Sequence, residues 1–83
     1  MTSYKVRDIE QETPVFLGYL VEDNTALILT EEGSILTVNE SDGEVQVQAQ
    51  NADGISGGTI SPAQDYIYVV TKNNTIVMLD AEF

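Results

Sequence analysis

The sequence predicts an all-β chain built from two copies of one strand module. Runs of β-branched and aromatic residues recur between turn signals, and only stretches of a few residues follow helical spacing. The pattern of Ala26 to Asp42 returns at Ile67 to Phe83, 41 residues further on, and places Thr30 on Thr71. Internal periods of about 40 to 45 residues that each hold several short strands are typical of β-propeller blades.

Four strands joined by tight turns are expected in the first unit. The strands are predicted at Val15 to Val21, Ala26 to Thr30, Ser34 to Asn39 and Glu44 to Gln50. The turns between them are Glu22 to Asn24, Glu31 to Gly33 and Ser41 to Gly43, and the last contains Asp-Gly, a strong hairpin signal. The first unit therefore reads as an antiparallel meander.

The polarity of the strands changes across this meander. The second and third strands are apolar at successive positions, which is expected where both faces of a sheet are covered. The fourth strand alternates, which predicts Val45, Val47 and Ala49 on the inner face and the glutamines on the outer face. Middle strands covered on both faces, beside a half-exposed outer strand, favour a propeller blade over an isolated meander.

The second unit follows the same plan but stops early. Its first strand, Ser56 to Ser61, consists of small residues that suit a crowded innermost position. Tyr66 to Thr71 and Thr75 to Asp80 are expected to follow, and the fourth strand is missing. We therefore expect a single segment over residues 1–83, with one blade at about 13–50 and an incomplete blade at about 55–83. A charge placed on the third strand by Ile76→Asp is expected to unfold the chain.

About two blades cannot close a ring, because closed propellers carry roughly 4 to 8. Three alternatives remain open: the segment is an excerpt of a longer protein, several copies assemble, or Tyr4 to Ile9 supplies the absent strand. An open sandwich of two sheets is the alternative fold that the sequence allows. Unpaired strand edges would also allow self-association.

Composition excludes several classes of function. The chain has no cysteine and no histidine, which leaves out disulfides, zinc-thiolate sites and the usual general base. Fourteen acidic residues against 3 basic ones give a net charge of −11, so neither nucleic acid nor an anionic membrane is an expected partner. The first eight residues lack the apolar core of a secretory signal, which favours a cytoplasmic location.

The remaining chemical groups give no catalytic, cofactor or metal site. The available carboxylate pairs are Glu31 with Glu32, Glu22 with Asp23, and Glu40 with Asp42. All lie at predicted turn tips, where solvated carboxylates keep ordinary acidity. The oxygen-rich stretch Asn39 to Glu44 lacks the register of an EF-hand calcium loop.

Glycines and aromatic residues are also better explained by structure than by chemistry. Gly54, Gly57 and Gly58 are followed by neither the helix nor the lysine that a phosphate-binding loop needs. Tyr66 and Tyr68 alternate on one strand face and are expected to pack between blades. An enzyme built on a propeller would need a cluster of polar groups at the central channel. In this chain mainly Gly57, Gly58, Thr59 and Ser61 would line that channel, so we do not expect an enzyme.

A set of short motifs resembles blades of WD-type propellers, and more narrowly the N-terminal propeller of Elongator complex subunit 1. The motifs are Gly54-Ile55-Ser56, Ile60-Ser61-Pro62, Gln64-Asp65, Val70-Thr71, Thr75 and Phe83. The match covers roughly two-thirds of the chain, with Ile60 where the family often has Trp and Leu79-Asp80 in place of Trp-Asp. The resemblance implies a non-catalytic scaffold that holds protein subunits, without a cofactor, in a complex that modifies wobble uridines of tRNA.

A second resemblance is to quinoprotein-like propeller repeats. Asn39, Asp42 and Gly43 take the positions of Asp, Thr and Gly in that repeat, and Val47 stands where the docking Trp should be. This alternative would imply an exported enzyme or an outer-membrane assembly protein. The missing Trp and the missing signal segment argue against it.

Overall fold

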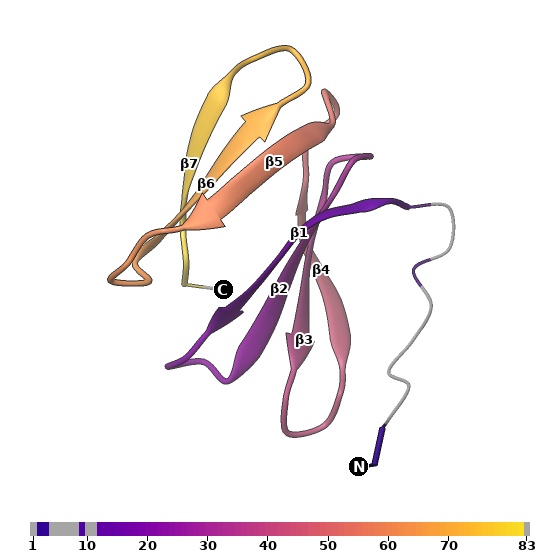
Figure 1. The fold of residues 1–83 in the computed structure, drawn as a ribbon, viewed down its shortest axis with the longest axis vertical. Helices are drawn as coiled ribbons and strands as arrows, with labels where there is room; N and C mark the ends of the chain where they lie inside the picture. Colours follow the sequence, from indigo (N-terminus) through magenta and orange to yellow (C-terminus); the bar gives the residue numbers. More distant parts are fainter. Residues whose placement is uncertain (1, 4–8, 10–11, 83) are drawn as a thin grey trace.

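The computed structural model describes residues 2–3, 9 and 12–82, and every regular element in this part of the chain is a β-strand. The strands are β1 (Pro14–Leu20), β2 (Thr25–Thr30), β3 (Ser34–Asn39), β4 (Val45–Gln50), β5 (Ile55–Ile60), β6 (Tyr66–Thr71) and β7 (Ile76–Asp80). They form two antiparallel sheets, sheet A with the order β1-β2-β3-β4 and sheet B with the order β5-β6-β7 (Figure 1). The all-β prediction is therefore confirmed.

Each end of the seven predicted strands lies within one residue of the observed end. The first strands of the two units both begin and end one residue earlier than expected, at Pro14–Leu20 and Ile55–Ile60. Sheet B has three strands in the described part of the chain. Tyr4 to Ile9, one of the alternatives for the absent strand, falls, apart from Ile9, outside the described residues.

The 41-residue repeat is a structural repeat. Strands β1 and β2 begin at residues 14 and 25, and β5 and β6 begin at 55 and 66. In both sheets the first strand is bulged at the same place, between residues 14 and 16 and between 55 and 57. The two sheets are thus copies of one module, and the copies share the bulge in the first strand.

The turn after the second strand shows why this module recurs. The hydroxyl of Thr30 accepts a hydrogen bond from the Ser34 amide at 3.0 Å, and Thr71 does the same for the Thr75 amide at 3.1 Å. The third turn residue has a positive φ in both sheets, +102° at Gly33 and +67° at Asn74. Glycine and asparagine tolerate this left-handed conformation better than other residues.

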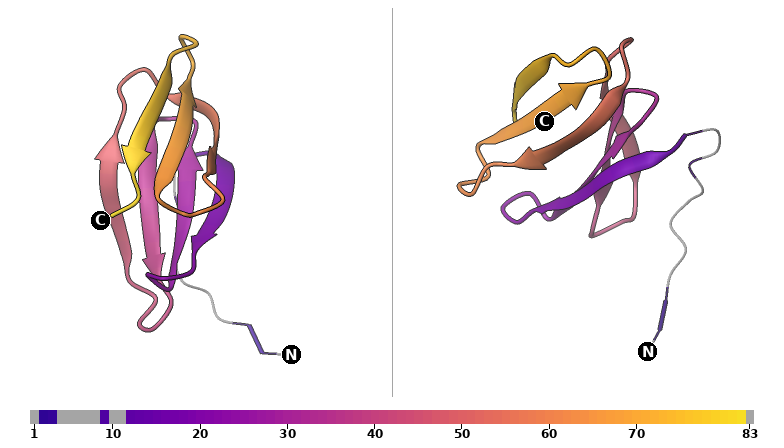
Figure 2. Two further views of the ribbon diagram at one scale, coloured as in Figure 1. Left: turned by 90° about the vertical axis from the view of Figure 1, so that its left-hand side faces the viewer. Right: turned by 45° about the horizontal axis from the view of Figure 1, so that its top comes forward.

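The hydrophobic core lies between the two sheets. Its buried members are Leu20, Leu27, Leu29, Ile35, Ile55, Ile67, Val69 and Ala81. Figure 2 shows sheet B lying across one face of sheet A, with the outer face of each sheet turned away from the other. Burying a leucine or isoleucine side chain stabilises the fold by about 1.5–3 kcal/mol, so this seam holds the chain together.

The sheets approach each other most closely along their first strands. Strand β5 packs against β1 and β2. A methyl group at Gly18 would lie 2.7 Å from Ile60 Cδ1, and one at Gly58 would lie 2.6 Å from Leu29 Cδ1. Small residues on the first strands let the backbones come close, as the composition of Ser56 to Ser61 predicts.

Two predictions about strand faces are wrong. In β4 a bulge opposite Ile35 and Leu36 breaks the alternation. Val45 and Val47 therefore pair with Val38 and Leu36 on the outer face, where Val47 is 51% exposed, and Gln46 pairs with Thr37 on the inner face. In β7 Ile76 is 73% exposed, because sheet A covers only one face of sheet B. A charge at Ile76 would therefore meet water, and Ile76→Asp is not expected to unfold this chain.

Candidate functional site

The outer face of sheet B is an exposed apolar surface. It is formed by Tyr66, Tyr68, Val70, Ile76 and Met78, which are between 36% and 73% exposed. The strand register places Tyr68 beside Met78 and Val70 beside Ile76. The expectation that the two tyrosines pack in a core is wrong for this chain, because they lie on the face that points away from sheet A.

The outer face of sheet A is apolar as well. Its exposed members are Leu17, Tyr19 and Val47. Leu17 lies beside the half-buried Ile28, and the next strand adds the fully buried Leu36. The molecule therefore carries an apolar face on each side of its core.

One polar contact fixes the edge of the outer face of sheet A. The Tyr19 hydroxyl donates a hydrogen bond to the carboxylate of Glu40, at the end of β3. This hydrogen bond raises the pKa of Tyr19 above its ordinary value, because it stabilises the protonated phenol, and the negative charge of Glu40 acts in the same direction. The Tyr19 ring is thereby held across the end of the sheet.

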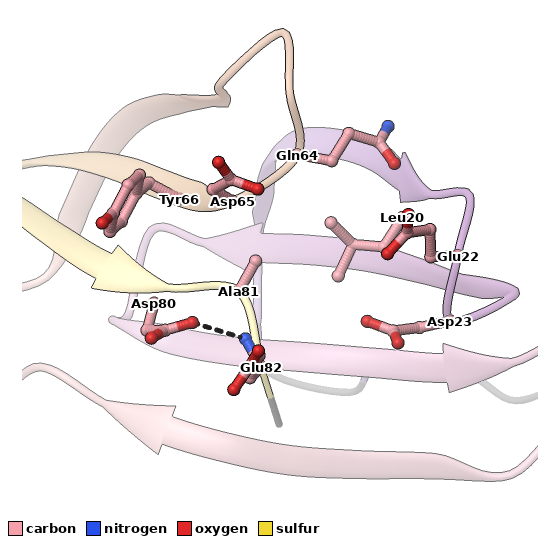
Figure 3. Close-up of a pocket in the computed structure, with 9 residues that line it drawn as sticks. All are labelled: Leu20, Glu22, Asp23, Gln64, Asp65, Tyr66, Asp80, Ala81 and Glu82. Atoms are coloured by element: carbon pink, nitrogen blue, oxygen red, sulfur yellow. Dashed lines mark hydrogen bonds between the residues drawn. The ribbon is translucent and has the colours of Figure 1, made fainter.

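An acidic pocket of about 330 Å³ opens at one end of the seam between the sheets (Figure 3). It is lined by Leu20, Glu22, Asp23, Gln64, Asp65, Tyr66, Asp80, Ala81 and Glu82. Five of these residues are carboxylates, and Asp80 accepts a hydrogen bond from the Glu82 amide at 3.0 Å. The pocket gathers much of the negative charge of the chain at one place.

Sequence reasoning did not find this pocket, although the repeat contained the signal. Residues 41 apart occupy equal places in the two sheets, so the β1–β2 turn with Glu22 and Asp23 lies near the β5–β6 turn with Gln64 and Asp65. Two neighbouring turns that each carry acidic residues would have predicted the cluster.

Gln64 joins the two sheets at the rim of the pocket. Its side-chain amide accepts a hydrogen bond from the Val21 amide at 2.7 Å and donates one to the Tyr19 carbonyl at 2.9 Å. It therefore pairs with the end of β1 as a neighbouring strand residue would. Gln64 has a φ of +62°, a conformation that points its side chain out of the turn toward β1.

We expect Gln64→Ala to lower the free energy of unfolding by about 1–2 kcal/mol, because a typical hydrogen bond contributes about 1 kcal/mol and two are lost. Gln64→Glu should cost at least as much, since a carboxylate cannot donate to the Tyr19 carbonyl. Gln46→Ala is the matched control, because Gln46 is exposed and its side chain, within the described residues, bonds to Glu44 and Gln48, which are near it in sequence. Urea unfolding of the three variants measures the differences, and equal losses for Gln64→Ala and Gln46→Ala would contradict the role of Gln64.

The carboxylate pairs singled out in the sequence take part in local structure. Glu31 forms an ion pair with Lys72 at 2.8 Å, and Glu32 accepts a hydrogen bond from the Thr13 amide at 2.7 Å. Asp42 accepts one from the Glu44 amide at 2.9 Å. Of the three pairs, only Glu22 with Asp23 faces the acidic pocket.

The two stretches in which the sequence lacks the features of a calcium or a phosphate site likewise form turn and strand structure. Asn39 accepts hydrogen bonds from the amide and the hydroxyl of Ser41, at 2.9 and 2.6 Å. Gly54, with a φ of +77°, makes the turn into β5, and Gly57 and Gly58 lie within that strand. Within the described residues, no group of three or more Asp and Glu side chains is arranged to hold a metal ion.

The chain was compared with protein families and with curated proteins. The family model described as ELP1 first N-terminal beta-propeller matches residues 2–83. The chain belongs to this family. The match confirms the resemblance to the first propeller of Elongator subunit 1 and extends it from two-thirds of the sequence to nearly all of it. No curated protein matches the chain.

Membership of the ELP1 propeller family explains the two stacked sheets as a partial β-propeller. Sheet A is a four-stranded blade, and sheet B has the first three strands of the same module. Blades of a propeller meet along their first strands, as β1 and β5 do here. The ELP1 propeller is a scaffold-type domain, so contact surfaces are where its function is to be sought.

In the part of the chain that the structure describes, no helix has the length and apolar character needed to cross a bilayer.

The structure also bears on the resemblance to quinoprotein-like repeats. Val47, which takes the place of the docking Trp in those repeats, is half exposed on the outer face of sheet A. The structure thus gives that second resemblance no buried docking residue at this position.

Proposed function

We propose that this chain is a non-catalytic scaffold segment of an Elongator subunit 1, located in the cytoplasm. In this role it supports the modification of wobble uridines in tRNA by holding other protein subunits in place. The observation that carries the proposal is the family match over residues 2–83. No direct contact with nucleic acid is part of the proposal, because a net charge of −11 opposes binding to phosphates.

The form of the molecule supports a role in protein contacts. Apolar side chains that are more than half exposed, such as Leu17, Ile76 and Met78, are gathered on sheet faces. Contiguous exposed apolar surface of this kind marks protein interaction sites. We further propose that the two sheets are consecutive blades of one segment, one blade at about residues 13–50 and the incomplete one at about 55–83.

Exchange of the segment tests the proposed function. In cells that lack Elongator subunit 1, a copy of that subunit is supplied in which residues 2–83 of this chain replace the matching part of the first propeller. The expected result is that modified wobble uridines return in tRNA, measured by mass spectrometry of tRNA nucleosides. The same exchange carrying Leu29→Asp, which places a charge in the core, should not restore the modification.

Two measurements separate function from folding. The amount of the exchanged subunit is measured by immunoblot, and its association with the other Elongator subunits by co-purification. A subunit that accumulates to normal levels and binds its partners without restoring the modification would contradict the proposed function. Restoration by the Leu29→Asp exchange would contradict it as well, because the segment would then be dispensable.

A further inference from the structure

Two aspartates of the chain are followed directly by glycine, Asp42 by Gly43 and Asp53 by Gly54. The backbone of such a pair can rearrange, because the amide nitrogen of the glycine attacks the side-chain carboxyl carbon of the aspartate. Glycine favours this attack, since it has no side chain to shield its amide and its backbone turns freely. The fold places the two pairs in very different surroundings.

Asp42 and Gly43 lie in an open hairpin tip. The tip follows the last strand pair between β3 and β4, which joins Val38 to Val45. Asp42 is exposed, and a methyl group added at Gly43 would meet no described atom within 4 Å. The backbone at this pair can therefore turn without a clash.

The hydrogen bonds that hold this first pair are local. The Gly43 amide donates to the Asn39 carbonyl at 2.7 Å, and the Asp42 carboxylate accepts from the Glu44 amide at 2.9 Å. Both bonds must open before the Gly43 nitrogen reaches the Asp42 carboxyl carbon. Both lie within the tip, so this opening leaves the strand pairing and the core intact. Local openings of exposed turns are the least costly ones in a folded protein.

Asp53 and Gly54 lie in the connection between the two sheets. Gly54 is buried, and a methyl group added there would lie 2.7 Å from the carbonyl oxygen of Glu31. Its amide donates to the Asn51 carbonyl at 3.1 Å, and its carbonyl accepts from the Lys72 amide at 3.3 Å. Turning the Gly54 amide toward the Asp53 carboxyl carbon therefore breaks the junction between the sheets, an opening close to global unfolding.

We propose that Asp42 is a site of isoaspartate formation in the folded protein, and that the fold protects Asp53 from the same change. The Gly43 nitrogen bonds to the Asp42 carboxyl carbon, and one carboxyl oxygen leaves as water with the amide proton and a proton from solvent. The product is a five-membered succinimide. The proposal rests on the accessibility of the two pairs and does not depend on the proposed function.

Water then opens the succinimide ring in one of two ways and returns a proton to solvent. Attack at the side-chain carbonyl carbon restores aspartate. Attack at the main-chain carbonyl carbon breaks its bond to the Gly43 nitrogen, so that the chain continues through the side-chain carbon and the α-carboxylate is free. The overall change leaves the mass unaltered and needs only water. A free α-carboxylate of this kind is the group that isoaspartyl methyltransferases methylate with S-adenosylmethionine.

The product fits the tip better than it would fit the junction. Isoaspartate lengthens the backbone by one carbon atom, and the space beside Gly43 admits this carbon. At Gly54 the same carbon would displace a buried backbone segment that is bonded on both sides. We therefore expect the protein that is modified at Asp42 to keep both of its sheets.

Ageing of the whole 83-residue chain tests the proposal. The protein is kept at neutral pH and body temperature, with and without urea, and circular dichroism follows its β-structure. Isoaspartate is measured by enzymatic transfer of labelled methyl groups and located by peptide mass spectrometry with electron-transfer fragmentation. Without urea it should form at Asp42 about tenfold or more faster than at Asp53, because only the tip opens locally. In urea both positions should convert at similar rates.

Matched variants give an independent readout. Asp42→Asn and Asp53→Asn form the same succinimides with loss of ammonia, which the mass of the protein reports. In the folded state Asp42→Asn should convert and Asp53→Asn should persist, and urea should remove this difference. Gly43→Ala should slow the change at Asp42 severalfold, because the added methyl group shields the amide.

Three results would overturn the proposal. The first is a folded protein that forms no isoaspartate at Asp42 while the urea sample does. The second is equal conversion at Asp42 and Asp53 while circular dichroism shows intact β-structure. The third is a chain without β-structure in buffer, since the protection of Asp53 depends on the fold.

Discussion

Leu29→Asp is expected to unfold the chain. Leu29 is fully buried between the sheets, and its Cδ1 atom lies 2.6 Å from the place that a methyl group on Gly58 would take. No counter-charge stands near it among the core residues Leu27, Ile35 and Val69. An unpaired buried charge costs more than about 4 kcal/mol, which is comparable with the whole stability of a small domain. Circular dichroism and thermal unfolding at a fixed protein concentration measure the loss.

The matched control for this substitution is Ile76→Asp. It introduces the same charge at the third strand of sheet B, on a side chain that is 73% exposed. We expect a change in the free energy of unfolding of less than about 1 kcal/mol, apart from any contribution of association to stability. A Leu29→Asp protein that melts within a few degrees of its parent would show that the seam between the sheets is not the core.

The comparison of these two sites shows what the sequence could and could not predict about the fold. Strand positions and turns follow from short-range patterns, and the 41-residue repeat predicts the equivalence of Thr30 with Thr71, which their matching turn hydrogen bonds confirm. Apolar residues at successive positions correctly indicated strands suited to burial on both faces. They could not indicate which face has a neighbour within this chain, because that depends on the number of sheets and not on local pattern. Ile35 is buried and Ile76 exposed for this reason.

The surfaces were less predictable than the fold for two physical reasons. A single-residue bulge in β4 places Val47 on the outer face of sheet A instead of the inner face. Alternation of apolar and polar residues does not reveal such a bulge when no glycine stands at it. The acidic pocket combines turns that are about 40 residues apart, so no local motif contains it. Both features become foreseeable only when the two repeats are superimposed in space.

Gly33→Ala is expected to be the most damaging of the small substitutions, because both backbone conformation and space oppose it. Gly33 has a φ of +102°, and a methyl group there would lie 1.9 Å from the carbonyl oxygen of Asn51. That oxygen belongs to the backbone of the connection into sheet B, and the Asn51 amide in turn donates to the Gly33 carbonyl at 2.8 Å. Any shift that relieves the clash must therefore break the junction between the sheets.

The control Gly43→Ala separates the two causes. Gly43 also has a positive φ, +71°, but a methyl group there would meet nothing within 4 Å. We expect Gly43→Ala to cost about 1–2 kcal/mol, from the left-handed conformation alone. Gly33→Ala should cost about 2–5 kcal/mol, because the clash adds to the same conformational term. Urea unfolding at equal protein concentration gives both values. Equal losses at the two glycines would mean that the β2–β3 turn does not support the connection between the sheets.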